Sequence, residues 1–175
     1  MIKKFKTLFV VKSSLIFLYL SLTIPIPFVS SDKLKIVSTI FFFLGLIFII
    51  NLTNDYVETS DKKIYYKASF FSNIFGKKNW EIFWKDIKLI KSLPTSQGSK
   101  VYYFTLNNEE NYLVPQRIEN LEKLKSLIAK NTTLGLEAQK IDYISALWTY
   151  KLLTFLSLLM IVGEIILFWI RYYQD

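Results

Sequence analysis

The charged side chains that could take part in chemistry are few, and they lie in patterns typical of a solvated surface. Asp86 stands between Lys85 and Lys88, and Glu109 is followed directly by Glu110. General acid–base catalysis needs titratable groups that face a substrate across a cleft. Asp86 follows a strand-like segment and the two glutamates occupy a turn-like one. We therefore interpret both groups as solvated surface.

Histidine and cysteine are absent from the 175 residues. Their absence excludes metal sites built from those ligands, thiol nucleophiles and Ser–His dyads. We predict a protein that is not an enzyme, with no catalytic residue, no cofactor or cofactor-binding residue and no metal site. Nucleic acid is not an expected partner, because all but two of the 22 basic residues are lysine and no recognised binding motif occurs.

One acidic residue stands inside an apolar segment near the C-terminus. Glu164 follows Gly163 within residues 152–170, and an acid at the centre of a membrane helix costs about 2.5–3.5 kcal/mol. Such residues face other protein, and a neighbouring glycine permits close helix approach. We predict that Gly163 and Glu164 contact a partner helix, with Ser21 or Thr23 as alternative hydrogen-bond partners. An acid without a role and an ion or proton pathway are the competing interpretations.

A second candidate site is the segment 71–79, which combines aromatic and basic residues. Phe71 and Phe75 could enter the headgroup region of a membrane, while Lys77 and Lys78 meet anionic lipid at about 1 kcal/mol each. The same four residues could instead dock a partner domain. The plainer interpretation is an ordinary lysine-rich hairpin.

Three apolar runs must position these candidates. They cover residues 13–30, 36–52 and 152–170, and they explain a hydrophobic content of 52%. Each is long enough to cross a hydrocarbon core of about 30 Å as a helix. We predict an N-terminal tail and transmembrane hairpin over residues 1–52, and a third transmembrane helix over 152–170 that follows a juxtamembrane linker at 132–151.

Lysine and arginine predict the orientation of these helices, because short cytoplasmic flanks are enriched in them. The N-terminus carries four lysines and the segment 53–142 carries fourteen basic residues. The turn at 30–35 carries two, and the C-terminal tail carries only Arg171. We therefore expect an integral protein of the bacterial inner membrane or the thylakoid. Its N-terminus and insert would lie on the cytoplasmic or stromal side, and its C-terminus on the opposite side.

The insert between the second and third runs changes from strand periodicity to helix periodicity. Alternating residues predict strands near 63–70, 80–84, 87–93, 101–106 and 112–114. Pro115 then opens a helix whose apolar face includes Leu121, Leu124 and Ile128. We therefore predict a small curved antiparallel sheet with a C-terminal amphipathic helix, because such a sheet needs a second apolar layer. The expected class is an α+β membrane protein.

This pattern over residues 55–131 resembles the pleckstrin-homology-like (PH-like) domains of small bacterial membrane proteins. The residues that carry the resemblance are DKKI at 61–64, WKDIKLI at 84–90, LVP at 113–115 and IENL at 118–121. The resemblance implies a PH-like domain, and a helix hairpin before the domain is common in that family.

A second resemblance is to the photosystem I assembly factors of chloroplasts and cyanobacteria. It rests on the hairpin before the domain, on DKK at 61–63, and on FGKKN at 75–79 ahead of KDI at 85–87. Those factors have no third crossing after the domain, and here the run at 152–170 departs from them. The resemblance implies a role in assembling a photosynthetic complex.

Together these features predict a non-catalytic scaffold, or an assembly or stability factor, for a membrane protein complex. The expected partners are membrane lipids and another membrane protein complex. The alternative is a membrane-bound sensor that binds lipid headgroups through its PH-like domain.

Overall fold

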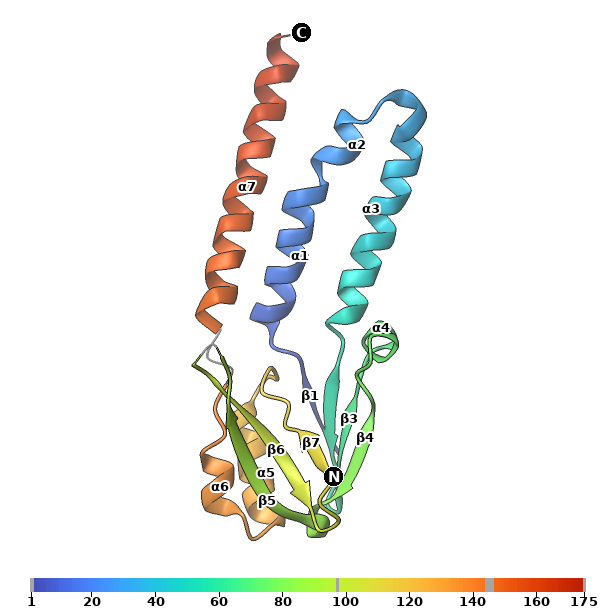
Figure 1. Cartoon of the computed structure of the whole chain (residues 1–175). Coiled ribbons are helices and arrows are strands. Elements are labelled where there is room, and N and C mark those ends of the chain that lie inside the picture. The colour runs from blue at the N-terminus through green and yellow to red at the C-terminus, as the bar shows by residue number, and fades with distance from the viewer. Residues whose placement is uncertain (1, 97, 144–146, 175) are drawn as a thin grey trace. The chain divides into compact units, whose positions relative to one another are not determined.

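The computed structural model describes residues 2–96, 98–143 and 147–174 and shows an α+β protein (Figure 1). The chain divides into two compact units. The first, here called the domain, comprises Met1–Leu8 and Asn54–Leu147. The second, here called the helical unit, comprises Phe9–Thr53 and Trp148–Asp175.

The domain contains two small antiparallel sheets, where the sequence predicted one curved sheet. The first sheet has the order β1-β2-β3-β4, with β1 (Lys3–Lys6), β2 (Tyr56–Thr59), β3 (Lys63–Lys67) and β4 (Trp80–Phe83). The second has the order β5-β6-β7, with β5 (Ile87–Pro94), β6 (Lys100–Leu106) and β7 (Asn111–Leu113). The chain leaves the first sheet through the 3-10 turn η1 (Trp84–Asp86), which separates β4 from β5.

The domain extends beyond residues 55–131 at both ends. At the N-terminus, β1 pairs with β2 and buries Phe5. At the other end, the short helix α6 (Gly135–Gln139) lies within the segment 132–151 and buries Ala138 completely. Strand β1 contributes only Phe5 to the core, and the segment after α5 contributes scattered side chains, with Ala138 and Ile141 buried, so neither segment has a long apolar pattern.

The amphipathic helix of the insert begins later than Pro115. Helix α5 runs from Leu121 to Asn131 and follows Asn120, which has a positive φ of 56°. The residues before it form an isolated bridge and a turn instead, because the N-terminal chain pairs with them: Leu8 N donates to Arg117 O at 2.8 Å and Glu119 N donates to Lys6 O at 2.8 Å. This pairing partner lies more than a hundred residues away in the sequence, which local periodicity does not show.

The core of the domain lies where the sheets and α5 meet. Fully buried side chains come from β2, β3, β6 and α5: Val57, Ile64, Phe104, Leu121, Leu124 and Ile128. Burying one such side chain stabilises the fold by about 1.5–3 kcal/mol. The apolar face predicted for α5 therefore does form the second layer over the sheets.

The helical unit contains three helical segments long and apolar enough to cross a membrane: Phe9–Val29, Asp32–Leu52 and Leu147–Arg171. The first consists of α1 (Phe9–Thr23) and α2 (Pro25–Val29), the second is α3 (Asp32–Leu52), and the third belongs to α7 (Leu147–Gln174). The break between α1 and α2 falls at Pro25, which lacks the N–H needed to continue the helix. Three such segments indicate an integral membrane protein.

Candidate functional site

The carboxylate of Asp55 gathers donors from three separate segments of the domain. The Tyr66 hydroxyl of β3 donates to Asp55 Oδ2 at 2.9 Å, and the Lys77 ammonium donates to the same oxygen at 2.6 Å. The Ser69 backbone N–H donates to Oδ1 at 2.8 Å. The Asp55 side chain is only 12% exposed. One carboxylate therefore joins the start of β2, the end of β3 and the segment that follows.

These bonds change the titration of both partners. Partial burial raises the pKa of Asp55, but the hydrogen bonds from Lys77, the Ser69 backbone, Ser72 and Tyr66 outweigh it, so the pKa is lowered overall. Burial, followed by the nearby Asp55 charge, raises the pKa of the Tyr66 phenol. The carboxylate is thus ionised and the phenol neutral over the physiological range.

The segment between β3 and β4, residues 68–79, is a closed loop and contains a short helix. Helix α4 (Phe70–Ile74) begins at Ser69, whose Oγ accepts a bond from Ser72 N at 3.3 Å. Asn79 Oδ1 accepts from Ala68 N at 2.8 Å and ties the two ends of the loop together. Gly76 has a φ of +89°, a conformation that favours glycine, and it turns the chain back toward β4.

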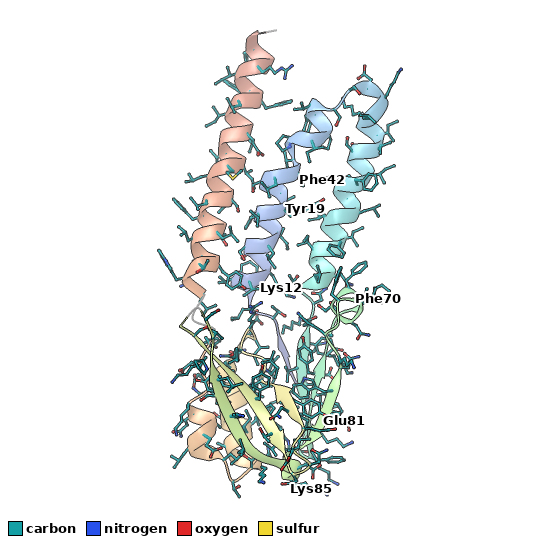
Figure 2. All side chains as sticks on the ribbon, viewed as in Figure 1. Lys12, Tyr19, Phe42, Phe70, Glu81 and Lys85 are labelled. Atoms are coloured by element: carbon teal, nitrogen blue, oxygen red, sulfur yellow. The ribbon has the colours of Figure 1, made fainter. Side chains whose placement is uncertain are left out.

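The loop presents an apolar face that differs from the one predicted. Phe70, Ile74 and Phe75 are 69%, 62% and 67% exposed. Phe71 is half-buried, and its ring contacts that of Phe70 edge-on at 5.3 Å between centroids. Figure 2 labels Phe70 on α4. Sequence reasoning assigned residue 70 to a strand, which hid the helical i, i+4 spacing of Phe70 and Ile74.

The two lysines predicted for this loop lie in different surroundings. Lys77 forms an ion pair with Asp55 and is 54% exposed. Lys78 is exposed. The loop therefore offers one lysine whose charge is matched within the domain and a second at its surface.

Glu164 and Gly163 occupy neighbouring positions on α7 with different environments. Glu164 is half-buried, and its Oε2 is a buried oxygen without a hydrogen-bond partner. Within residues 2–96, 98–143 and 147–174, the other buried side-chain atom in this state is Oγ of Ser157, which is 1% exposed. At Gly163, an added Cβ would meet nothing within 4 Å. The structure thus places an unpaired acid beside an open backbone surface.

The intramolecular partners considered for Glu164 use their hydroxyls elsewhere. Ser21 Oγ donates to Leu18 O at 2.9 Å, and Thr23 Oγ1 donates to Tyr19 O at 2.7 Å. Both bonds stay within α1, as is common for hydroxyls in membrane helices. Neither residue satisfies the acid.

A tyrosine of α1 contacts α3 through both its hydroxyl and its ring. Tyr19 Oη donates to Phe42 O at 2.7 Å, and the Tyr19 ring lies over Gly45, where an added Cβ would come within 2.8 Å of Tyr19 Cζ. Figure 2 shows Tyr19 on α1 and Phe42 on α3. Sequence reasoning missed this contact, although a glycine opposite a tyrosine in two adjacent apolar runs is a usable signal.

The opposite side of α1 is also buried. Ser14 and Ser21 are 0% and 1% exposed, lie seven residues apart and therefore share a face. At about 100° per residue this face points away from Tyr19. In Figure 1, helix α1 is drawn between α3 and α7 of the same unit. The ring of Phe28 in α2 contacts the ring of Phe168 in α7, with 5.4 Å between centroids, and so joins the first and third candidate spans.

The remaining charged groups form no metal-binding cluster among the residues that the structure describes. Glu110 accepts a bond from the Tyr112 hydroxyl at 2.7 Å, within its own hairpin. The Asp86 backbone oxygen accepts from Asn107 N at 3.1 Å, which joins η1 to the β6–β7 turn. Both are structural roles on the surface of the domain.

The fold and these sites define an α+β protein with three candidate membrane-spanning helices. No family model matches the chain. It is similar to the uncharacterized protein slr0269 of Synechocystis sp. (strain ATCC 27184 / PCC 6803 / Kazusa). The two are 28% identical over 156 residues, which cover 86% of this chain and 77% of that cyanobacterial protein.

Proposed function

We propose that this protein is a non-catalytic, membrane-anchored scaffold, or an assembly or stability factor, for a membrane protein complex. In this proposal α7 binds a helix of the partner through Gly163 and Glu164. The domain remains at the membrane surface and supplies further binding area.

The observation that carries the proposal is the pair of unpaired oxygens on α7. Ser157 and Glu164 are seven residues apart, so they share one face of the helix. A buried polar atom without a hydrogen bond costs several kcal/mol in hydrocarbon, where no water can replace the bond. Glu164 is only half-buried, so a donor from a partner helix would reach it from its exposed side and remove its share of this cost, whereas Ser157 is covered by the chain itself. The open backbone at Gly163 leaves room for such a helix to approach closely.

The orientation of the chain is part of the proposal. Strand β1 pairs with β2 along four residues, which supports a topology with the N-terminal segment and the insert on the same side of a membrane. Two crossings before the insert are compatible with that topology. The basic residues of both segments favour the cytoplasmic or stromal side, and a third crossing would place the C-terminus opposite.

The PH-like architecture and the photosynthetic setting are proposed on resemblance. The motifs at 61–64 and 84–90 fall on β3 and on η1 with β5, and α5 follows the sheets as it does in a PH-like domain. The similar protein slr0269 comes from a cyanobacterium, a group in which the photosystem I assembly factors of the second resemblance occur. Headgroup sensing receives less support, because the Lys77 ammonium is already bound to Asp55.

The test is purification of the tagged full-length chain in mild detergent, followed by mass spectrometry of the proteins that accompany it. We expect a membrane complex in stoichiometric amount. Glu164→Leu should abolish co-purification, because the leucine cannot exchange a hydrogen bond, and Glu164→Gln should retain part of it. Ile166→Leu is the matched control, since Ile166 is 53% exposed on the same helix and carries no polar atom. Recovery of the unaltered chain and of all three variants without any accompanying protein would contradict the proposal.

A further inference from the structure

We propose that the loop 68–79 is a second attachment of the domain to the membrane, independent of any partner complex. Phe70, Ile74 and Phe75 lie at the boundary between lipid headgroups and acyl chains, with α4 in the plane of the membrane. The occupant of this apolar face is the bilayer that α3 crosses.

The composition of the loop surface fits a lipid interface. Its three large apolar side chains are each more than 60% exposed and lie within six residues of one another. Clustered exposure of this kind marks an interaction site, whereas single exposed side chains are ordinary. Lys78 lies exposed at the edge of the same loop, where a lysine meets anionic headgroups.

The loop is held in one conformation without any lipid. Asp55 accepts bonds from Ser69 N and Lys77, Asn79 accepts a bond from Ala68 N, and Ser72 on the inner side of α4 is completely buried. Its apolar side chains are therefore presented outward on a fixed backbone. Such a surface loses little conformational freedom when it enters a membrane, so more of the apolar burial contributes to binding.

The connection of the chain determines which surface the loop can reach. Asp55 follows Leu52, the last residue of α3, by three residues, and three residues span at most about 10 Å. The Thr7 hydroxyl also donates to Asp55 O at 2.8 Å, and Thr7 precedes Phe9, the first residue of α1, by two residues. Both candidate spans thus meet the domain at the residue that holds the loop. A bilayer crossed by α1 and α3 has its surface within reach of α4.

The test uses the absence of cysteine from the chain. The variant Ile74→Cys carries a single thiol for a fluorescent label, and the full-length protein is reconstituted into lipid nanodiscs without any other protein. The control is Lys62→Cys, because Lys62 is exposed in the turn at the other end of the β2–β3 hairpin. Two quenchers are compared: lipids with a nitroxide near the headgroup, and aqueous iodide.

We expect nitroxide lipids to quench the label at position 74 several-fold more strongly than the label at 62, with the opposite order for iodide. Adding Phe70→Ser and Phe75→Ser should remove the difference, because the apolar face is then lost. Equal quenching at both positions would overturn the inference. Protection of the label at position 74 from iodide in native membranes but not in nanodiscs would also overturn the inference. That result would assign the apolar face of the loop to a protein partner.

Discussion

Two carboxylates show how differently the two units of this protein treat their polar groups. Asp55 in the domain accepts bonds from Tyr66, Ser69 and Lys77. Glu164 in the helical unit has an oxygen that is buried and unpaired. The domain satisfies its buried acid within one chain, whereas α7 leaves its acid unsatisfied. This difference is the reason that the proposal assigns the contact with another molecule to α7 and not to the Asp55 site of the domain.

The apolar residues of the two units differ in the same sense. Phe104 and Leu124 are completely buried by other parts of the domain. In α3, all of which the structure describes, no residue is buried, and Phe41 and Ile47 are more than 60% exposed. The hydrophobic effect in water drives the burial of apolar side chains in the domain. The exposed apolar side chains of α3 fit a hydrocarbon environment instead.

The largest effect should come from the core of the domain. Phe104→Ala removes a fully buried ring that contacts Trp80 at 6.2 Å between centroids, and such a change costs about 3–5 kcal/mol. Thermal unfolding in detergent, followed by tryptophan fluorescence, should show the loss. Ile165→Ala, at a position 61% exposed on α7, should leave the domain transition unchanged. Equal losses in the two variants would show that the units do not differ as described.

The packing of α1 on α3 provides the next effect. Gly45→Ala places a methyl group within 2.8 Å of Tyr19 Cζ, and overpacking of this kind costs about 1–3 kcal/mol. Gly163→Ala makes the same chemical change where an added Cβ meets nothing within 4 Å beyond its own helix backbone, so it should not lower stability. Thermal inactivation of the detergent-solubilised protein compares the two. A stronger loss for Gly163→Ala would place the tight helix contact on α7 instead.

Acid pH should remove the stabilisation that the Asp55 carboxylate contributes to the domain. Because the folded-state pKa of Asp55 is depressed, its stabilising contribution is present above the unfolded value, about 3.9. This contribution is lost as the pH falls through the lower folded value. Asp55→Asn should destabilise the domain by about 1–2 kcal/mol at neutral pH and flatten this acid dependence. Unfolding curves of both proteins between neutral and acid pH provide the measurement, and an unchanged slope in Asp55→Asn would refute the assignment.

The smallest effect should come from an ion pair at the surface of the domain. Lys63 pairs with Glu81 across β3 and β4, and the Glu81 side chain is 45% exposed. Water and salt screen such pairs, so Glu81→Gln should leave the unfolding temperature unchanged within error. A loss of stability as large as that of Asp55→Asn would mean that solvent exposure does not determine how much the Lys63–Glu81 and Lys77–Asp55 pairs contribute.

The sequence predicted the parts whose signal is local and missed the parts whose partners are distant. Apolar length revealed all three candidate spans, and alternation revealed β3 and β6. Strand β1 reads as a basic flank, because Phe5 is its single buried residue and its partner β2 lies fifty residues away. The second sheet was missed because the break at η1 depends on Trp84, whose ring N–H donates to Ser60 O at 2.9 Å.

The candidate sites divide in the same way. Glu164 was predictable, because one acid in an apolar run is visible without any structure. The exposed face of Phe70, Ile74 and Phe75 was not, since it depends on a five-residue helix that tertiary bonds to Asp55 and Asn79 stabilise. Short helices carry little propensity signal of their own, and their context decides them.

The most direct test of a partner at α7 is photo-crosslinking from position 163 in native membranes. A photoreactive residue is tolerated there, because an added Cβ meets nothing within 4 Å beyond its own helix backbone. The proposal predicts a covalent adduct with one other membrane protein, which disappears when Glu164→Leu is added. Adducts with lipid alone, unchanged by Glu164→Leu, would contradict it.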